Sequence, residues 1–66
     1  MKNNIKIERA RHNMTQANLA DEIGVSRQSI NAIEQGKYVP STVLAIKIAK
    51  LFKMPVEALF IIEEND

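Results

Sequence analysis

Thr15 and Ser26 favour helix starts, and Gly24 favours a helix end just before Ser26. This spacing predicts two short helices joined by a tight turn. Hydroxyl side chains cap helix N-termini, and glycine ends helices where the backbone turns left-handed. We therefore expect one helix from Thr15 to about Ile23, a turn at Gly24 and Val25, and a second helix capped by Ser26. The apolar residues expected on the inner faces of this pair are Leu19, Ala20, Ile23, Val25, Ile30 and Ile33.

The connection between these two helices is short and contains glycine, which is the helix-turn-helix pattern. Ala20 is small enough to let the helices cross closely, and Val25 fills the angle between them. Gly36 ends the second helix for the same reason that Gly24 ends the first. We place this unit at about residues 15–35.

Three further helices are predicted around this unit. One runs from about Asn4 to His12, another from the cap Ser41 to about Lys53, and a short one from Val56 to Phe60 after Pro55. Residues 61–63, with the sequence IIE, favour a strand instead. The inward stripe of the Ser41 helix is expected to be Leu44, Ala45, Ile48, Leu51 and Phe52, with Val43, Ile46, Lys47, Lys50 and Lys53 outside it.

The composition excludes several classes of protein. The 66 residues carry a formal net charge of +1 and contain no cysteine, so a disulfide framework and a cysteine-based metal or redox site are excluded. The longest apolar run, Ala58 to Ile62, is far too short to span a membrane, and no signal peptide is visible. We expect one domain, residues 1–66, in a cytoplasmic protein.

The sequence gives little support for catalysis. His12 is the only histidine, no glycine-rich phosphate loop is present, and no partner for a general base is suggested. One histidine among scattered carboxylates does not predict a metal site. We expect no enzymatic activity, no metal, no cofactor and no small-molecule ligand.

Three stretches together carry a resemblance to a known family. They are TQANLADEIGVSRQSINAIEQGKYVPS, LAIKIAKLF and MPVEALF, which cover most of the chain. In these residues the chain resembles the Cro and phage-repressor family of helix-turn-helix regulators, also called the xenobiotic-response-element type, and particularly its compact members. At Glu8 the chain departs from the family, which often has an apolar residue before the arginine at the position of Arg9.

The resemblance implies a fold and a class of function. The fold is all-α, a lambda-repressor-like domain of five short helices, with a small antiparallel sheet in which Lys2 and Asn3 lie beside Ile61 to Glu63. Members of the family are mostly dimeric transcriptional regulators, usually repressors, that bind double-stranded DNA. A homodimer on a pseudo-palindromic operator is therefore expected, and a protein-interaction scaffold with the same fold is the alternative.

The start of the Ser26 helix is the expected reading element, because in this architecture that end enters the major groove. Arg27 has the planar fork that bonds guanine O6 and N7, and Gln28 can pair with adenine N6 and N7. Asn31 is expected to read bases beside them. The alternative for these polar residues is a solvated helix start. Contacts to the groove or to phosphates are expected from Gln16, Ser26, Ser29, Ala32, Lys37 and Tyr38.

For other residues we expect a structural role or a place in a subunit interface. Glu34 is expected to face away from DNA, in a salt bridge with Arg9. Lys37 and Tyr38 have the alternative of being ordinary loop residues. The expected dimer interface is formed by apolar residues left over once the core is filled, with Leu59, Ile61 and Ile62 as the first choice and Val43 and Ile46 as the second.

Overall fold

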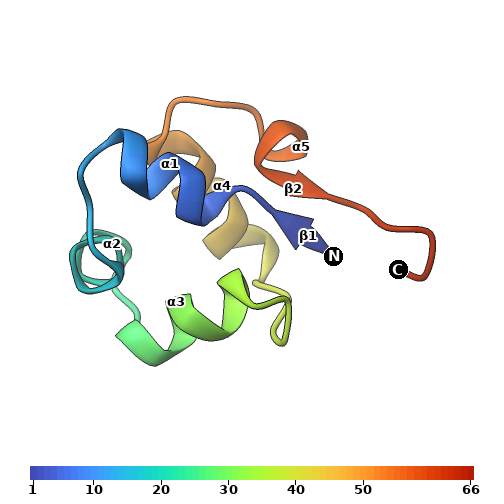
Figure 1. Ribbon diagram of the computed structural model, residues 1–66, viewed down its shortest axis with the longest axis horizontal. Coiled ribbons are helices and arrows are strands. Elements are labelled where there is room, and N and C mark those ends of the chain that lie inside the picture. The colour runs from blue at the N-terminus through green and yellow to red at the C-terminus, as the bar shows by residue number, and fades with distance from the viewer.

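The computed structural model describes residues 1–66 and contains five helices and two short strands in an order close to the predicted one. Figure 1 shows α2 and α3 on one side of the molecule, with α5 and the two strands on the side away from α2. None of the helices is both long and apolar enough to cross a membrane. The elements are β1 (Lys2–Asn3), α1 (Ile5–Arg11), α2 (Gln16–Ile23), α3 (Arg27–Glu34), α4 (Thr42–Leu51), α5 (Val56–Leu59) and β2 (Phe60–Ile61).

The three predicted hydroxyl caps are confirmed. Thr15, Ser26 and Ser41 each have extended backbone, and each side chain accepts a hydrogen bond from the backbone N–H three residues later. At Thr15 the arrangement is reciprocal, because the side chain of Asn18 also accepts a hydrogen bond from the N–H of Thr15 at 3.0 Å. These caps fix where α2, α3 and α4 begin.

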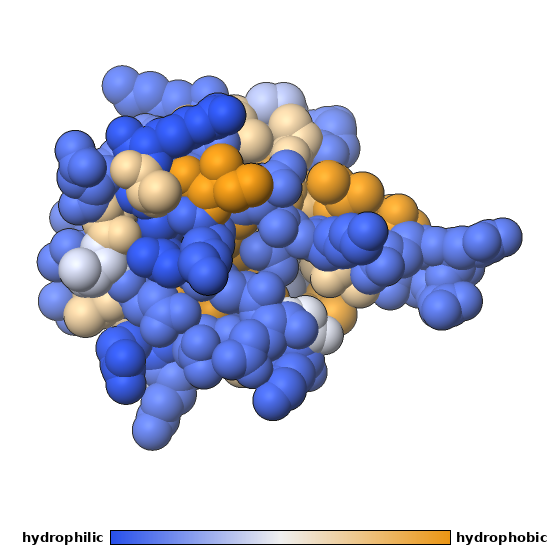
Figure 2. All heavy atoms as spheres, viewed as in Figure 1, coloured by the Kyte–Doolittle hydropathy of each residue, from blue (hydrophilic) through white to orange (hydrophobic).

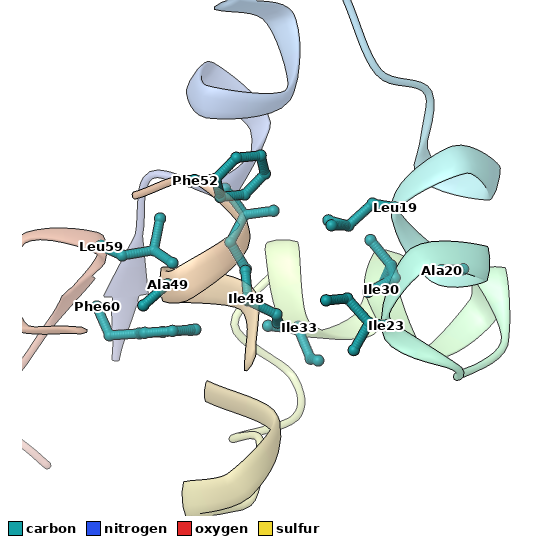
Figure 3. Close-up of a cluster of buried hydrophobic side chains, with 11 residues drawn as sticks. Leu19, Ala20, Ile23, Ile30, Ile33, Ile48, Ala49, Phe52, Leu59 and Phe60 are labelled. Carbon is teal, nitrogen blue, oxygen red and sulfur yellow. The ribbon is translucent and has the colours of Figure 1, made fainter. Parts of the chain in front are cut away.

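One cluster of buried apolar side chains forms the core, and it draws on all five helices (Figure 3). The predicted inner faces of α2 and α3 are confirmed, and Val25 packs against the cluster as expected. Ala49 of α4 is also buried, although it was not expected in the inward stripe; Figure 3 draws it near Leu59 and Phe60. The cluster consists of Ile5, Leu19, Ala20, Ile23, Ile30, Ile33, Ile48, Ala49, Phe52, Leu59 and Phe60.

The two strands pair antiparallel, which confirms the small sheet, but the second strand is Phe60–Ile61 and not the expected Ile61 to Glu63. Lys2 lies opposite Ile61 and Asn3 opposite Phe60, so the strand begins before Ile61 and α5 ends at Leu59. The reason is the side chain of Phe60, which belongs to the core. A strand points successive side chains to opposite faces, so Phe60 faces inward and Ile61 faces outward.

Glu8, where the chain departs from its family, does not disturb α1. Its side chain is nearly buried, and Oε2 accepts a hydrogen bond from Nη1 of Arg11, one turn later, at 3.0 Å. His12 follows the helix as its exposed C-terminal cap, as expected. Its ring also lies 5.1 Å from that of Phe52, measured between centroids. The pairing of Glu8 with the solvent-exposed Arg11 therefore accommodates an acidic residue at the edge of the core.

The turn between α2 and α3 depends on Gly24, whose φ of +86° lies in the left-handed region. No heavy atom lies within 4 Å of where a Cβ would stand, so a side chain there would be strained by the backbone and not by a clash. We expect Gly24→Val to lower the free energy of unfolding by about 2 kcal/mol, measured by urea titration.

Gly24→Asn is the matched control, because asparagine adopts left-handed backbone far more readily than valine. It should lose less than half as much stability. Equal losses in the two variants would show that the backbone conformation at Gly24 is not what limits substitution there.

Candidate nucleic-acid interface

The N-terminal turn of α3 presents Arg27 and Gln28 to solvent. Both side chains are exposed, and no hydrogen bond joins either of them to the rest of the protein. The helix that carries them is fixed from behind by Ile30 and Ile33, which are buried in the core. A rigid helix with free guanidinium and amide groups at its start can form paired hydrogen bonds with base edges.

Ser26 and Ser29, two predicted groove contacts, are engaged with each other. Oγ of Ser26 accepts a hydrogen bond from the backbone N–H of Ser29 at 3.1 Å, and the two hydroxyl oxygens lie 2.9 Å apart. Ala32, a third predicted contact, is half-buried on the next turn. The two serines shape the start of α3, and the contact of all three residues with DNA stays a prediction.

The expected salt bridge between Arg9 and Glu34 is confirmed and is bidentate. Nε and Nη2 of Arg9 donate to Oε2 and Oε1 of Glu34 at 2.6 and 3.0 Å, and Nη1 donates to the carbonyl of Met14 at 3.0 Å. The side chains are 13% and 7% exposed. The hydrogen bonds that Arg9 donates to Glu34 raise the pKa of Arg9 above its ordinary value, so the guanidinium stays charged and joins α1 to the end of α3.

Asn31 lies at the end of a row of amide side chains that starts at this ion pair. Nε2 of Gln16 donates to Oε1 of Glu34 and to Oδ1 of Asn31, in each case at 3.2 Å. Nε2 of Gln35 also donates to Oδ1 of Asn31, at 3.3 Å. The role of Gln35 was not anticipated, although its spacing of four residues from Asn31 is one at which helical side chains meet.

This geometry changes the expectation for Gln16. Its side-chain N–H groups already have protein acceptors, so the side chain would have to leave Glu34 and Asn31 to donate to a phosphate. The backbone N–H of Gln16 lies in the first turn of α2, where amides have no partner within the helix. The backbone is therefore the better candidate for a phosphate contact.

Lys37 and Tyr38 follow α3 in an exposed connection. The backbone N–H of Lys37 donates to the carbonyl of Ala32 at 3.0 Å, after Gly36 has turned the chain with a φ of +75°. Both side chains are exposed, so they remain available for the predicted phosphate contacts.

The electrostatics of this surface suit an anion. Neither α2 nor α3 has an acidic residue in its first turn, so the positive ends of both helix dipoles are uncompensated. In Figure 2 the surface over α3, in the lower part of the view, is mostly hydrophilic. No group of histidine, cysteine, aspartate and glutamate residues that could hold a metal ion is found.

A second surface, near α5 and β2, is apolar. One open hollow of about 220 Å³ is lined by Val39, Ile46 and Phe60 among others, and a second of about 380 Å³ by Phe60, Ile61 and Ile62 among others. Met1, Val56 and Phe60 line both, so the hollows are neighbours. Figure 2 shows hydrophobic atoms gathered at this end of the molecule. We call this surface the β2 face and define it by Met1, Val39, Ile46, Val56, Phe60, Ile61 and Ile62.

Four of the five residues expected at a dimer interface are exposed, and one is not. Ile46, Ile61 and Ile62 belong to the β2 face, and Val43 is exposed one turn before Ile46 on α4. The expectation for Leu59 is wrong, because this side chain is completely buried in the core of its own chain. Leu59 ends α5 on its inner side, so it has no surface to offer a partner.

Comparison with known proteins agrees with this arrangement. A family model described as helix-turn-helix matches residues 5–59. An uncharacterized HTH-type transcriptional regulator of Methanocaldococcus jannaschii is 56% identical over 66 residues, and the match covers 100% of both chains. The uncharacterized HTH-type transcriptional regulator YgzD of Bacillus subtilis is 48% identical, again over 100% of both chains. Another, from Archaeoglobus fulgidus, is 47% identical over 100% of this chain and 93% of that protein.

Proposed function

This chain belongs to the helix-turn-helix family of Cro and phage-repressor type regulators, and from that premise we propose that it regulates transcription by binding double-stranded DNA with sequence specificity. In this proposal α3 enters the major groove by its N-terminal turn, and Arg27 and Gln28 pair with base edges. The observation that carries the proposal is that these two side chains are exposed and unpaired at the start of a helix whose other face is buried.

Phosphate contacts would hold α3 in place. The candidates are the backbone N–H of Gln16 at the start of α2 and the side chains of Lys37 and Tyr38 beyond α3. These groups lie on both sides of the reading turn along the chain, so they can fix its orientation on the duplex while carrying no sequence information.

Replacing Arg27 by Ala should weaken specific binding by about 1–3 kcal/mol per half-site and relax the preference for one base pair, because a bidentate base contact is lost. Lys37→Ala should instead weaken binding to all sequences alike and reduce the slope of affinity against salt by about one unit per site. Both effects can be measured by titrating labelled duplexes at several salt concentrations.

The two variants serve as controls for each other, since each removes one exposed positive charge, at the start of α3 for Arg27 and just beyond its end for Lys37. Equal weakening of specific and random DNA by Arg27→Ala would contradict the base-reading role. If the unmodified protein bound no duplex DNA near physiological salt, the scaffold alternative would be favoured.

We further propose that the protein acts as a homodimer through the β2 face on a pseudo-palindromic operator. One short reading helix covers only a few base pairs, and two half-sites about 34 Å apart correspond to one turn of DNA. The long axis of the protein measures 31 Å, and the β2 face lies toward one end of it, so two copies joined there would separate their α3 helices on a comparable scale. Repression is the proposed outcome, because regulators of this family are usually repressors.

Ile62→Asp tests the dimer. Ile62 is 78% exposed and outside the core, so the charge should leave the helix content unchanged while it shifts the sedimentation coefficient toward that of the monomer and strongly weakens binding to a two-half-site operator. Analytical ultracentrifugation at micromolar concentration measures the first effect.

Ile7→Asp is the matched control, because Ile7 is also an exposed isoleucine but lies on α1 and outside the β2 face. It should sediment as the unmodified protein does. An unmodified protein that is monomeric at micromolar concentration and binds both half-sites without cooperativity would rule out the dimer.

A further inference from the structure

In the row of hydrogen-bonded amides that ends at Asn31, each hydrogen bond determines which amide atom is left for the next one. The row therefore decides which atom Asn31 can offer to DNA. The row begins at Glu34, whose carboxylate is held by two hydrogen bonds from Arg9. A carboxylate only accepts hydrogen bonds, so Gln16 must turn its amide nitrogen, and not its oxygen, toward Glu34.

The same nitrogen of Gln16 carries a second hydrogen, which points to Asn31. Nε2 of Gln16 lies 3.2 Å from Oδ1 of Asn31, and a nitrogen donor requires an oxygen acceptor at that position. Gln35 adds a second donor, since its Nε2 lies 3.3 Å from the same oxygen. The ion pair of Arg9 with Glu34, partly buried, thus fixes the orientation of three successive amides out to the surface.

From this row we infer that Asn31 meets DNA as a hydrogen-bond donor only. Both acceptor positions of Oδ1 are used by Gln16 and Gln35, whereas Nδ2 has no partner within the protein. The inference rests on the proposed function, because it concerns which acceptor on DNA faces the exposed second turn of α3. Gln16 and Gln35 act here as positioning residues.

Donor-only contact predicts a particular base preference. Reading adenine with two hydrogen bonds requires asparagine to accept from N6 and donate to N7 at once, and the engaged oxygen prevents the first of these. Nδ2 alone finds an acceptor on adenine (N7), on guanine (N7 and O6) and on thymine (O4), whereas cytosine offers only a donor in the major groove. The base opposite Asn31 is then any base except cytosine, with no preference for adenine over guanine, which differs from the adenine contact expected of a free asparagine. A phosphate oxygen offers the same acceptor chemistry.

The experiment selects binding sites from random duplexes with the unmodified protein, Asn31→Ala and Asn31→Asp. Aspartate keeps an acceptor for Gln16 and Gln35 but loses the donor, so the fold is preserved while the contact is reversed. At the base pair where Asn31→Ala loses preference, we expect the unmodified protein to bind adenine and guanine within about twofold and Asn31→Asp to select cytosine, whose N4 is a donor. Added negative charge alone cannot produce that gain.

Two modified duplexes separate the two sources of the acceptor. With adenine at the selected position, its replacement by 7-deazaadenine should weaken binding of the unmodified protein but not of Asn31→Ala, if the acceptor is N7. If no base preference depends on Asn31, a methylphosphonate at one backbone position should instead distinguish the two proteins, which assigns the acceptor to a phosphate.

Gln16→Ala combined with Gln35→Ala gives a readout that a purely structural role would not change. Freeing Oδ1 should convert the exclusion of cytosine at that position into a preference for adenine over guanine of about tenfold.

Three results overturn the inference. The first is a preference for adenine of tenfold or more at the Asn31-dependent position of the unmodified protein, the second is an Asn31→Asp variant that binds the selected site as tightly as the unmodified protein, and the third is insensitivity to both modified duplexes. If the unmodified protein retains no duplex at all, the proposed function itself fails, which distinguishes that failure from the three above.

Discussion

Replacing Glu34 by Gln is expected to lower the free energy of unfolding by about 3 kcal/mol, because it leaves the guanidinium of Arg9 with no charged partner in a site where the side chain is only 13% exposed. The amide can accept one of the two hydrogen bonds that the carboxylate accepts, but it supplies no negative charge. Urea unfolding followed by circular dichroism, at one fixed protein concentration, measures the loss.

Glu8→Gln is the matched control. Glu8 is similarly buried, but its partner Arg11 has a side chain that is 70% exposed and remains solvated when the pair is broken. We expect Glu8→Gln to lose about 1 kcal/mol or less. The double variant Arg9→Met with Glu34→Leu should recover most of the loss of Glu34→Gln, since apolar replacements leave no charge behind. A loss below about 1 kcal/mol for Glu34→Gln would mean that solvent screens the pair.

Ile48→Ala should lower the free energy of unfolding by about 3 kcal/mol, because the side chain is fully buried and its removal leaves a cavity as well as losing apolar contact. Ile48 comes from α4 and sits in the middle of the cluster, between the side chains of α2 and α3 and those of α5 (Figure 3). In so small a domain this loss corresponds to a fall in melting temperature of about 10 °C or more, which calorimetry can measure.

Ile7→Ala removes the same atoms from an exposed position on α1, outside the core. It should change the free energy of unfolding by less than about 0.5 kcal/mol. If Ile48→Ala were as mild as this control, the core would have to collapse around the missing side chain with almost no loss of contact.

The helices of this protein could be predicted because their start signals are local. Thr15, Ser26 and Ser41 cap helices through hydrogen bonds to residues only three positions away, so the sequence alone identifies them. The strand register could not be predicted in the same way, because it depends on whether Phe60 turns into the core. Leu59 was misassigned for the same reason: its burial depends on how α5 packs, which no local pattern specifies.

For the candidate site, the exposed start of α3 could be predicted from helical spacing, and the pairing of Arg9 with Glu34 was expected only as the structural alternative to a functional role for Glu34. The engagement of Gln16 could not be predicted, because residues 16 and 31 meet only when α2 and α3 cross at a particular angle. The spacing of residues within one helix does not specify the angle at which two helices cross. The direction of the amide row is likewise a property of the packed structure, since it starts from a carboxylate contributed by α3 and a guanidinium contributed by α1.

The pairing of β1 with β2 has a consequence for the order in which the chain folds. The contact of Lys2 with Ile61 closes a loop that contains nearly every other residue, whereas α2 and α3 are separated by only three residues. Closing the longer loop costs more entropy and is rewarded by only four strand residues, so it favours a late position on the folding pathway. We therefore expect the α2–α3 unit to form the nucleus of the transition state and the strand pair to close after that barrier has been crossed.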